Sequence, residues 1–375
     1  MPMKIVELPF NVKSPILACG ADIKGAFALA KGRKAYLFEG FGDLADVDNL
    51  ERYGRAVKAA VKRLRIDPKI VACDLHPGYF SSRFAQSFQL SAFSYQLYRV
   101  QHHEAHVAAA IVDNAIRGSV IGVAFDGTGY GRDGNIWGGE FFTGNLRSLE
   151  RAAHLEYVPM PGGEACIREP WRMAASYLCK AFGERFLDVK IDFVRSIDKK
   201  KWLILKKMIE GGLNSPLTSS AGRLFDAAAA IILLRKEARF EAELPIRLEE
   251  ATDPSVGGHY DFDVKASGRE FVIDSKKILR GIVKDLLGKT DPFVAAGKFH
   301  NTTACVIRKT AARLRKRSGI NNVVLSGGVF QNRFLTEKTF DMLRESGFRV
   351  RVHGAVPVND DGIPIGQVAI ANAKV

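Results

Sequence analysis

The chain has 375 residues, of which 47% are hydrophobic and 26% charged, and this composition is typical of a globular protein with two domains or lobes. No apolar run reaches the roughly 18 residues that span a bilayer, and the first residues lack the apolar core of a signal peptide. We therefore expect a cytoplasmic location and no membrane contact. The five cysteines are scattered without a C-x-x-C pair, which argues against a disulfide framework or a cysteine zinc finger. The formal net charge of +14 fits polyanionic partners such as nucleotides, nucleic acid or acidic proteins, and it equally fits a well-solvated surface.

Two segments of the chain, residues 16–40 and 119–142, share one pattern. Each starts with a strand of buried type that ends in Asp-x-x-Gly, at Asp22–Gly25 in the first segment and at Asp126–Gly129 in the second. A glycine-containing turn and a second apolar strand follow in both. We interpret the segments as related β-meanders, which predicts a duplicated protein.

Strands and helices alternate along the rest of the chain. The first meander is followed by a predicted helix over 49–65, a strand over 69–75, and a strand that enters a helix within "VQHHEAHVAAAI" (100–111). After the second come helical patterns over 169–239, a hairpin over 259–273, a strand over 322–328, a helix over 332–345, a strand over 348–354 and a last helix after Pro364. This alternation predicts an α/β protein.

Three of the eight histidines lie within "HHEAH", at the start of the Ala-rich helix. His102 and His106 are four residues apart, so a helix places both imidazoles on one face, where they can bind a single ion. His103 points about 100° away and is interpreted as a packing or outer-sphere residue. Asp126 and Asp360 lie beside glycines at expected strand ends, and carboxylates complete many sites for hard or borderline metals. Exposed histidines and ordinary Asp-Gly turns are the alternatives that this pattern leaves open.

A Gly-Gly pair, Gly327-Gly328 in "VVLSGGVFQN", comes directly after a predicted buried strand and before a helix. Such a turn lets backbone N–H groups approach a phosphate or nucleotide, although a turn without a ligand is also common. The chain contains neither the Walker pattern nor a G-x-G-x-x-G after its first strand. Two Asp-x-x-Gly hairpins and a Gly-Gly loop instead suggest the actin-like, sugar-kinase-like ATPase fold, in which two duplicated ribonuclease-H-like lobes enclose a nucleotide cleft.

Eight motifs then carry a resemblance to a known family. In chain order they are "DLHPGYFSSRFA", "VQHHEAH", "FDGTGYGRDGNIWGGEF", "PMPGGEACIREPWRMA", "SSAGRLFDAAAA", "KFHNTTA", "LSGGVFQN" and "PVNDDGIPIGQ". Together they resemble the C-terminal transferase domain of the HypF family, the carbamoyltransferases of NiFe-hydrogenase maturation. This domain is similar in turn to the tRNA threonylcarbamoyladenosine transferases.

The resemblance implies the same actin-like fold and a division into lobes. We expect an N-terminal lobe over 1–118 and a C-terminal lobe over 119–375, with a helical insertion at about 165–300. The last helix is expected to pack back on the N-terminal lobe.

The resemblance also implies a metal, zinc or iron, and a nucleotide, ATP or carbamoyl-adenylate. The metal would be held by His102, His106, Asp126 and Asp360. The nucleotide pocket would include Gly163, Glu169, Gly222, Asp226, Gly327, Gly328 and Asn332. Of these, Gly163 and Glu169 would lie near the ribose, and Gly327, Gly328 and Asn332 would hold the adenosine. His76 and His300 stand in two of the motifs without an assigned role.

The implied reaction is the transfer of a carbamoyl group from the adenylate to the C-terminal cysteine of a HypE-like partner. A cation near the carbamoyl or phosphate oxygens would stabilise the charge that develops during transfer. No catalytic side chain is singled out, because a metal-centred transfer needs no acyl-enzyme. Full-length HypF proteins also carry an acylphosphatase-like domain, zinc fingers and a YrdC-like adenylate-forming domain, none of which resembles a part of these 375 residues. A YrdC-like domain or protein in trans would then supply the adenylate.

Two positions depart from the HypF pattern, and other functions stay open. Glu104 stands where HypF proteins usually have histidine and the tRNA-modifying relatives commonly have glutamate, and Asp361 replaces a usual glycine. Glu104 and the positive charge favour a tRNA threonylcarbamoyladenosine transferase as the alternative. O-carbamoylation of a small molecule and a non-catalytic ATP-binding scaffold subunit are further alternatives.

Overall fold

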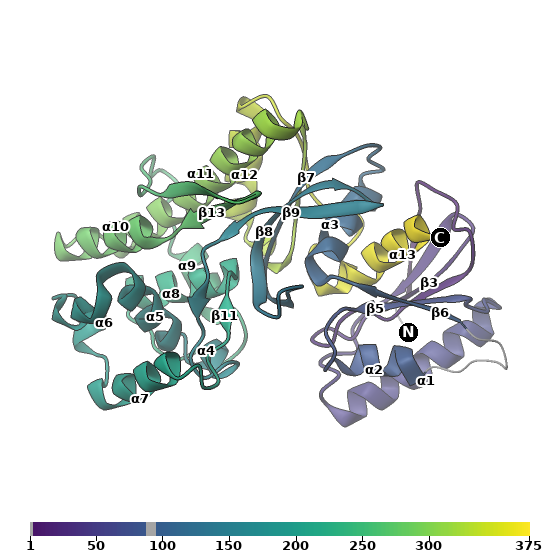
Figure 1. The fold of residues 1–375 in the computed structure, drawn as a ribbon, viewed down its shortest axis with the longest axis horizontal. Helices are drawn as coiled ribbons and strands as arrows, with labels where there is room; N and C mark the ends of the chain where they lie inside the picture. Colours follow the sequence, from purple (N-terminus) through teal and green to yellow (C-terminus); the bar gives the residue numbers. More distant parts are fainter. Residues whose placement is uncertain (1–2, 88–94) are drawn as a thin grey trace.

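Two mixed β-sheets organise the chain in the computed structural model, which describes residues 3–87 and 95–375 (Figure 1). The first sheet has the order β1-β4-β3-β2-β5-β6. Its strands are β1 (Met3–Glu7), β2 (Ile16–Ala18), β3 (Phe27–Lys31), β4 (Lys34–Phe38), β5 (Ile70–Asp74) and β6 (Gln96–Val100). Strands β2, β3 and β4 form the antiparallel meander predicted from the sequence, whereas β5 and β6 continue the sheet in parallel with β2.

The second sheet repeats this plan with two additional strands at one edge. Its order is β12-β13-β9-β8-β7-β14-β15, with the short β10 and β11 beside β8. The strands are β7 (Val120–Tyr130), β8 (Ile136–Asn145), β9 (Ser148–Leu155), β10 (Val158–Pro159), β11 (Leu217–Thr218), β12 (Asp263–Ser267), β13 (Glu270–Asp274), β14 (Asn322–Ser326) and β15 (Arg349–Arg351). The run β9-β8-β7-β14-β15 matches β4-β3-β2-β5-β6 in order and direction, so the prediction of a duplicated α/β fold is confirmed.

Helices cover both faces of the first sheet. They are α1 (Val47–Leu64) and α2 (Phe80–Ser87) on one face, and α3 (His102–Asp113) and α13 (Ile363–Lys374) on the other. Because successive strand residues point to opposite faces, Leu17 packs toward α1 while Ile16 and Ala18 pack toward α3 and α13. The last helix therefore lies on the first sheet, far from the strands that precede it in the chain (Figure 1).

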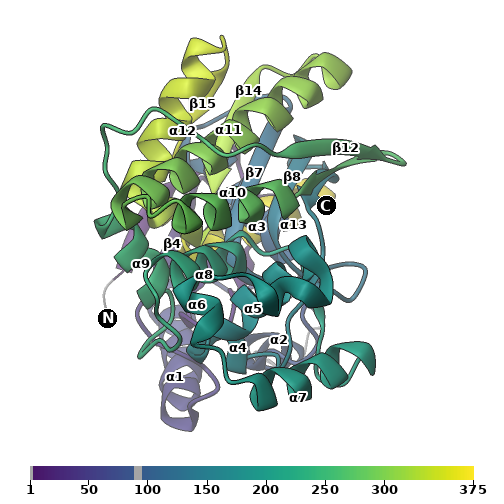
Figure 2. The same ribbon diagram turned by 90° about the vertical axis from the view of Figure 1, so that its left-hand side faces the viewer.

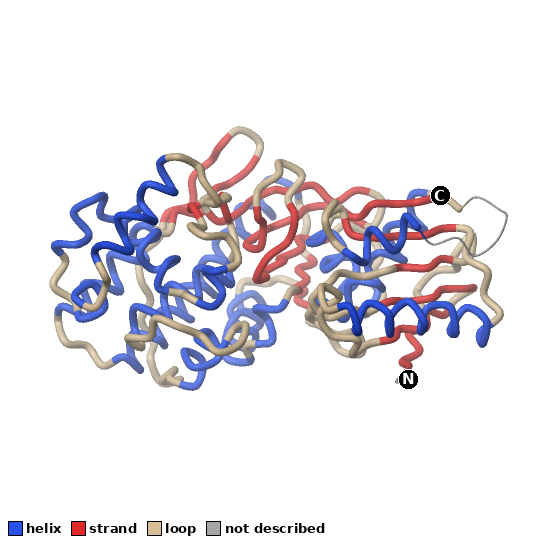
Figure 3. The backbone as a smooth tube through the Cα atoms, turned by 90° about the horizontal axis from the view of Figure 1, so that it is seen from below, coloured by secondary structure: helices blue, strands red, loops and turns tan. Residues whose placement is uncertain are grey.

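The larger lobe carries most of the remaining helices on the second sheet (Figures 2 and 3). They are α4 (Ala165–Arg168), α5 (Trp171–Phe182), α6 (Asp192–Arg195), α7 (Lys199–Glu210), α8 (Ala221–Ile232), α9 (Glu243–Glu250), α10 (Lys276–Leu287), α11 (Pro292–Ser318) and α12 (Arg333–Glu345). Short 3-10 turns lie at Gly183–Asp188, Gly328–Gln331 and Asp360–Gly362. The boundary near residue 118 and the helical insertion stay predictions, although residues on either side of that boundary build different sheets.

Helix α3 is buried between the two sheets. Ala105 and Ala108 belong to the hydrophobic core of the first sheet, whereas Val107 and Ile111 belong to a cluster with Val120 of the second. Its small side chains allow the close approach of elements on both sides, which explains the Ala-rich sequence after the histidines. The histidines at its start are consequently inside the molecule, so they are not the exposed histidines of the alternative interpretation. Among the described residues, no helix combines the length and apolar character needed to cross a bilayer.

Candidate metal and nucleotide site

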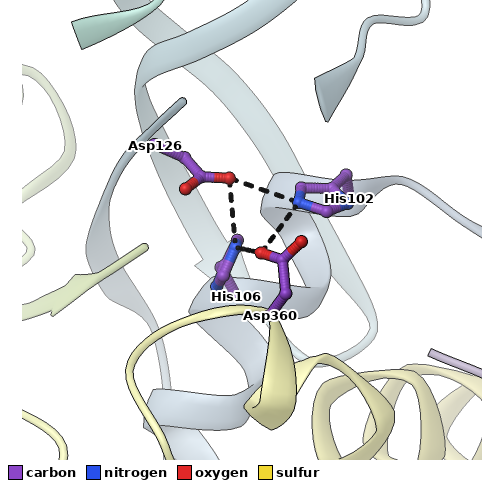
Figure 4. Close-up of side chains that lie close together, drawn as sticks. All are labelled: His102, His106, Asp126 and Asp360. Atoms are coloured by element: carbon purple, nitrogen blue, oxygen red, sulfur yellow. Dashed lines mark hydrogen bonds and ion pairs between the residues drawn. The ribbon is translucent and has the colours of Figure 1, made fainter. Parts of the chain in front are cut away.

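Four side chains from distant parts of the chain meet at the start of α3 (Figure 4). The Nε2 atom of His102 lies 3.3 Å from Asp126 Oδ2 and 3.6 Å from Asp360 Oδ1. The Nε2 atom of His106 lies 3.5 Å and 3.3 Å from the same two oxygens. One ligand atom from each residue lies within 4.8 Å of all the others, a spacing that one coordinated ion can span. We call these four residues the ligand group.

Asp126 lies inside β7 and not at the strand end expected from the sequence, whereas Asp360 begins the 3-10 turn Asp360–Gly362. Asp126 lies where the register of β7 against β8 shifts between Phe125 and Gly129, and its Oδ1 accepts a hydrogen bond of 3.0 Å from Gly328 N–H. Asp22 makes the corresponding contact in the first lobe, where its carboxylate accepts hydrogen bonds from the N–H groups of Phe80 and Ser81 at the start of α2. The repeat of this contact follows from the duplication of the fold, but only the second copy brings histidines to its aspartate.

The surroundings of the two imidazoles fit a bound metal. His102 Nδ1–H donates a 2.8 Å hydrogen bond to Asp74 Oδ2, which orients the ring and directs Nε2 toward the other ligands. His106 Nε2 is buried and has no hydrogen-bond partner among the described residues. A buried polar atom without a partner is costly, and a cation between the four ligand atoms would satisfy it. Imidazole and carboxylate donors suit zinc and iron alike.

The charges of the ligand group shift the pKa values of its members. Burial by itself lowers the pKa of His102, but the carboxylates of Asp360 and Asp74 outweigh it and raise the pKa well above its usual value. The pKa of His106 is raised for a similar reason, through Asp126 and Asp360. Burial opposes ionisation of Asp360, yet His102 lowers the pKa of this carboxyl to about 2. Without metal, these shifts favour the charged forms of the imidazoles and of the carboxylates.

We expect metal binding to release protons from this cluster. A histidine must be neutral to bind a metal, and the raised pKa values of His102 and His106 favour their protonated forms in the metal-free protein. Zn²⁺ affinity should therefore rise as pH increases above the ordinary histidine pKa of about 6.5. Calorimetry in buffers of different ionisation enthalpy measures the protons released. Binding without proton release near pH 7, or an affinity that falls with increasing pH, would contradict this assignment.

The neighbouring residues of α3 lie outside the ligand group. The Nδ1 atom of His103 lies 3.1 Å from the amide Nε2 of Gln101, and its ring lies 6.3 Å from that of Trp137, which agrees with the packing role expected for it. Glu104 pairs with Arg132 at 2.7 Å, away from the ligands. Asp361 is also outside the group, and burial raises the pKa of its carboxyl.

A cavity of about 520 Å³ opens beside the ligand group. Both lobes contribute to its wall, with Lys24 from the first and Thr128 from the second. Its lining residues are Ile23, Lys24, Asp126, Gly127, Thr128, Gly222, Arg223, Phe225, Phe240, Glu241, Ala242, Pro245, Ile246, Glu249, Gly328, Val329, Gln331, Asn332, Asn359 and Asp360. Asp126 and Asp360 thus belong both to the ligand group and to the cavity wall, and the cavity has the size of a small-molecule site.

Several residues predicted to hold a nucleotide lie at this cavity. Gly222, Gly328 and Asn332 line it. Gly327 precedes Gly328 and packs against the backbone of Phe125. Its φ is +101°, and a Cβ there would lie 2.3 Å from Phe125 O, so glycine is required. Asp226 is buried one helical turn from Gly222, with its Oδ2 atom 2.9 Å from Arg223 Nε. Burial raises the pKa of Asp226 to about 6.

Gly163 and Glu169 lie elsewhere in the larger lobe. A Cβ on Gly163 would lie 2.9 Å from Asn214 Oδ1, and Glu169 forms an ion pair of 2.5 Å with Arg172. Neither is among the residues that line the cavity in the described part of the chain. Their placement near a ribose stays a prediction from the resemblance alone.

His300, which had no role from the sequence, holds Asn332 in place. Its Nδ1–H donates to Ala296 O at 2.9 Å, so Nε2 accepts the Asn332 amide N–H at 2.9 Å. The amide oxygen of Asn332 in turn accepts Leu335 N–H at the start of α12. Burial lowers the pKa of His300 to about 4, which keeps the ring neutral and able to accept.

The resemblance implies a nucleotide in this cavity, and on that expectation replacing His300 by Phe should weaken AMP binding by about tenfold, because the Asn332 side chain loses the bond that orients it. The aromatic surroundings, with Phe225, Phe299 and Phe334 near the ring, favour retention of the fold. Titration calorimetry with AMP measures the effect. His259→Phe, remote from the cavity lining, is the matched control and should leave the affinity unchanged; equal losses in both variants would refute the positioning role.

Sequence reasoning missed three residues of this site. Asp74 was quoted within a motif but had no role, although its place at the end of a buried strand was a usable signal. Arg223 and Glu241 line the cavity. Arg223 stands in the motif "SSAGRLFDAAAA" but had no role of its own, and nothing in the local sequence distinguishes Glu241 from a surface residue. The position of Arg223 depends on how α8 packs against β7.

The duplicated lobes, the cavity that both line and the ligand group at its edge define a two-lobed α/β protein of the actin-like, sugar-kinase-like class. Comparison with known protein families identifies the family within this class. Residues 122–367 match the family described as carbamoyltransferase, Kae1-like domain, second subdomain, and residues 11–113 match the HypF Kae1-like domain. The chain belongs to the HypF carbamoyltransferase family, which confirms the resemblance stated from the motifs.

Individual relatives agree with this assignment. The chain is 32% identical to the carbamoyltransferase HypF of Synechocystis over 97% of its own length and 48% of that protein's length. It is 33% identical to a carbamoyltransferase HypF homolog of Cupriavidus necator, covering 96% of this chain and 91% of that protein. A crystal structure of full-length HypF in a phosphate- and nucleotide-bound form superposes with a TM-score of 0.92 at 38% identity, covering 98% of this chain and 57% of the other. The chain thus spans about half the length of most of the curated relatives that it matches.

Proposed function

We propose that the chain is a metal-dependent carbamoyltransferase that takes its carbamoyl group from a carbamoyl-adenylate. The observation that carries the proposal is the double role of Asp126 and Asp360, which belong to the ligand group and also line the cavity. A ligand in this cavity is necessarily adjacent to the ion. The nucleotide bound by the full-length HypF structure supports a nucleotide as that ligand.

Different residues of the cavity would bind and orient the nucleotide. Gly328 and Asn332 belong to the segment that follows β14 and line the cavity, where they would contact the nucleoside. Phe240 and Ile246 add apolar side chains to the cavity wall. A bound zinc or iron ion would supply Lewis-acid stabilisation to the oxygens of the reacting anhydride.

The transfer step needs an acceptor thiolate and no acyl-enzyme. The thiolate sulfur of a C-terminal cysteine on a HypE-like partner attacks the carbamoyl carbon, and a C–S bond forms. The bond from that carbon to the phosphate oxygen breaks, and AMP leaves with the electron pair. The adenylate comes from a YrdC-like domain or protein, which consumes ATP. The product is a thiocarbamate on a partner in hydrogenase maturation, the process to which the HypF family belongs.

A reconstitution in trans tests this function. The chain, loaded with Zn²⁺ or Fe²⁺, is combined with a YrdC-like protein, ATP, a carbamoyl donor and a HypE-like acceptor, and intact mass spectrometry follows the acceptor's terminal cysteine. We expect carbamoylation that depends on the metal and on the chain. The acceptor with Ser in place of that cysteine is the control. An unlabelled acceptor, in a mixture where carbamoyl-adenylate is detected, would refute the proposal and leave a scaffold role.

A tRNA arm in the same assay tests the alternative. The tRNA hypothesis rested on the charge and on Glu104, and Glu104 is engaged by Arg132 at 2.7 Å and does not face the ligand group. We therefore expect no threonylcarbamoyladenosine when the corresponding adenylate and tRNA are supplied. If threonylcarbamoyladenosine formed, the acceptor would be tRNA and not a partner protein.

A further inference from the structure

The guanidinium of Arg223 is buried beside the ligand group and is not used in the scheme above. Arg223 is 2% exposed, lies in the first turn of α8 and lines the cavity. The start of α8 packs tightly against the strand that carries Asp126, because Ser220 Oγ donates to Asp126 O and Gly127 O. A Cβ placed on Gly127 would lie 3.8 Å from Arg223 Nη2, so this nitrogen is next to the residue that follows the metal ligand.

The hydrogen-bonding capacity of this buried cation is largely unused. Its Nε lies 2.9 Å from Asp226 Oδ2, but without hydrogen-bond geometry, and Nη1 has no partner within the described residues. Burying a cation without full compensation costs several kcal/mol. Arg223 nevertheless lines the cavity, with Nη2 beside Gly127, so a guanidinium with unused N–H groups lies next to a space that an anion can occupy.

The charges around the cavity indicate which anion belongs there. Asp126 and Asp360 neutralise a divalent ion, so the metal site as a whole carries no net charge toward a ligand. Two glutamates also line the cavity. Glu249 accepts the N–H groups of Arg333 and Phe334 at the start of α12. Glu241 lies beside Arg223, since a Cβ on Gly127 would be 3.6 Å from Glu241 Oε1, and burial raises the pKa of the Glu241 carboxyl. Among the described lining residues, Lys24 is the other cation, and it is exposed on the first lobe. A phosphate near the ligand group therefore needs Arg223.

We propose that Arg223 is a catalytic residue that binds the phosphate of the nucleotide beside the ligand group and stabilises the charge that this phosphate gains when the carbamoyl–oxygen bond breaks. This proposal rests on the function proposed above and deepens it. Asp226 acts as a positioning residue, because its carboxylate lies 2.9 Å from Arg223 Nε and holds the guanidinium beside the cavity.

Binding measurements with and without a phosphate test the assignment. AMP and adenosine are titrated separately into the whole chain with Zn²⁺ present, for the wild type and for Arg223→Gln and Arg223→Lys. We expect AMP affinity to fall about 30-fold in Arg223→Gln, as for the loss of charge-assisted hydrogen bonds. AMP affinity should fall about tenfold in Arg223→Lys, because lysine keeps the positive charge but lacks the paired N–H donors of the guanidinium. Adenosine affinity should change less than about twofold in both.

The controls separate phosphate binding from damage to the fold. Arg247→Gln, at an exposed residue paired with Glu250, should leave both affinities unchanged. Thermal unfolding checks that the variants fold. If Arg223→Gln does not fold, the titrations with Arg223→Lys alone test the proposal. Equal losses for AMP and adenosine, unchanged AMP affinity, or no AMP binding by the wild type would each overturn the proposal. Because these titrations involve no carbamoyl transfer, a failed transfer assay with intact phosphate discrimination would sink the proposed reaction and leave the role of Arg223 in phosphate binding.

Discussion

Replacing His106 by Ala should lower Zn²⁺ affinity by more than about 100-fold. Loss of an outer partner of a metal ligand typically costs 10–100-fold, and loss of a ligand itself costs more. The two carboxylates would also remain close together without the imidazole that lies 3.3 Å and 3.5 Å from them. Competition with a chromophoric chelator measures the affinity, and elemental analysis measures the stoichiometry.

Two further variants show that the effect belongs to the ligand group. Asp74→Asn keeps the shape of the partner of His102 but removes its negative charge, so we expect an intermediate loss of about 10–100-fold in Zn²⁺ affinity. His103→Gln is the matched control on the same buried helix and should bind Zn²⁺ like the wild type, because His103 is outside the ligand group. If the His103 variant lost the metal as completely as the His106 variant, the proposed set of ligands would be wrong.

Replacing Gly366 by Ala should destabilise the protein by about 3 kcal/mol or more, the upper range for overpacking. A Cβ at this position of α13 would lie 1.9 Å from Ala105 O on α3, and a backbone atom cannot rotate away. The two helices must separate, and Ala105 lies between the two histidines of the ligand group. We therefore expect weaker metal affinity together with a lower midpoint of unfolding in denaturant.

An equivalent change in another helix provides the comparison. Gly54 lies within α1, and a Cβ there would meet Phe84 at 3.4 Å, close to ordinary contact. Since Ala is up to about 1 kcal/mol better than Gly in a helix interior, Gly54→Ala should be neutral or slightly stabilising. A Gly366 variant that is as stable as the Gly54 variant would show that α13 does not hold α3 in the way that the contact implies.

Local patterns in the sequence were sufficient for the elements and for the family. The predicted strand over 69–75 is β5 (Ile70–Asp74), and the predicted helix over 332–345 is α12 (Arg333–Glu345). Periodicity of apolar residues reports burial within a few residues along the chain, so it locates such elements well. The repeated Asp-x-x-Gly meanders predicted the duplication, and the ordered motifs predicted the HypF family, which the comparisons confirm.

Tertiary structure decided which side chains meet. The spacing of His102 and His106 put them on one helical face. Their glycine neighbours made Asp126 and Asp360 candidates, but only the resemblance assigned the two aspartates to the same ion as the histidines. Their approach depends on the two sheets that enclose α3. The bond between His300 and Asn332 and the buried position of Arg223 were not predictable, because each requires the packing of elements far apart in the chain. Local periodicity contains no information about such pairs: their distance is set by the burial of whole helix and sheet faces, which is a property of the assembled fold.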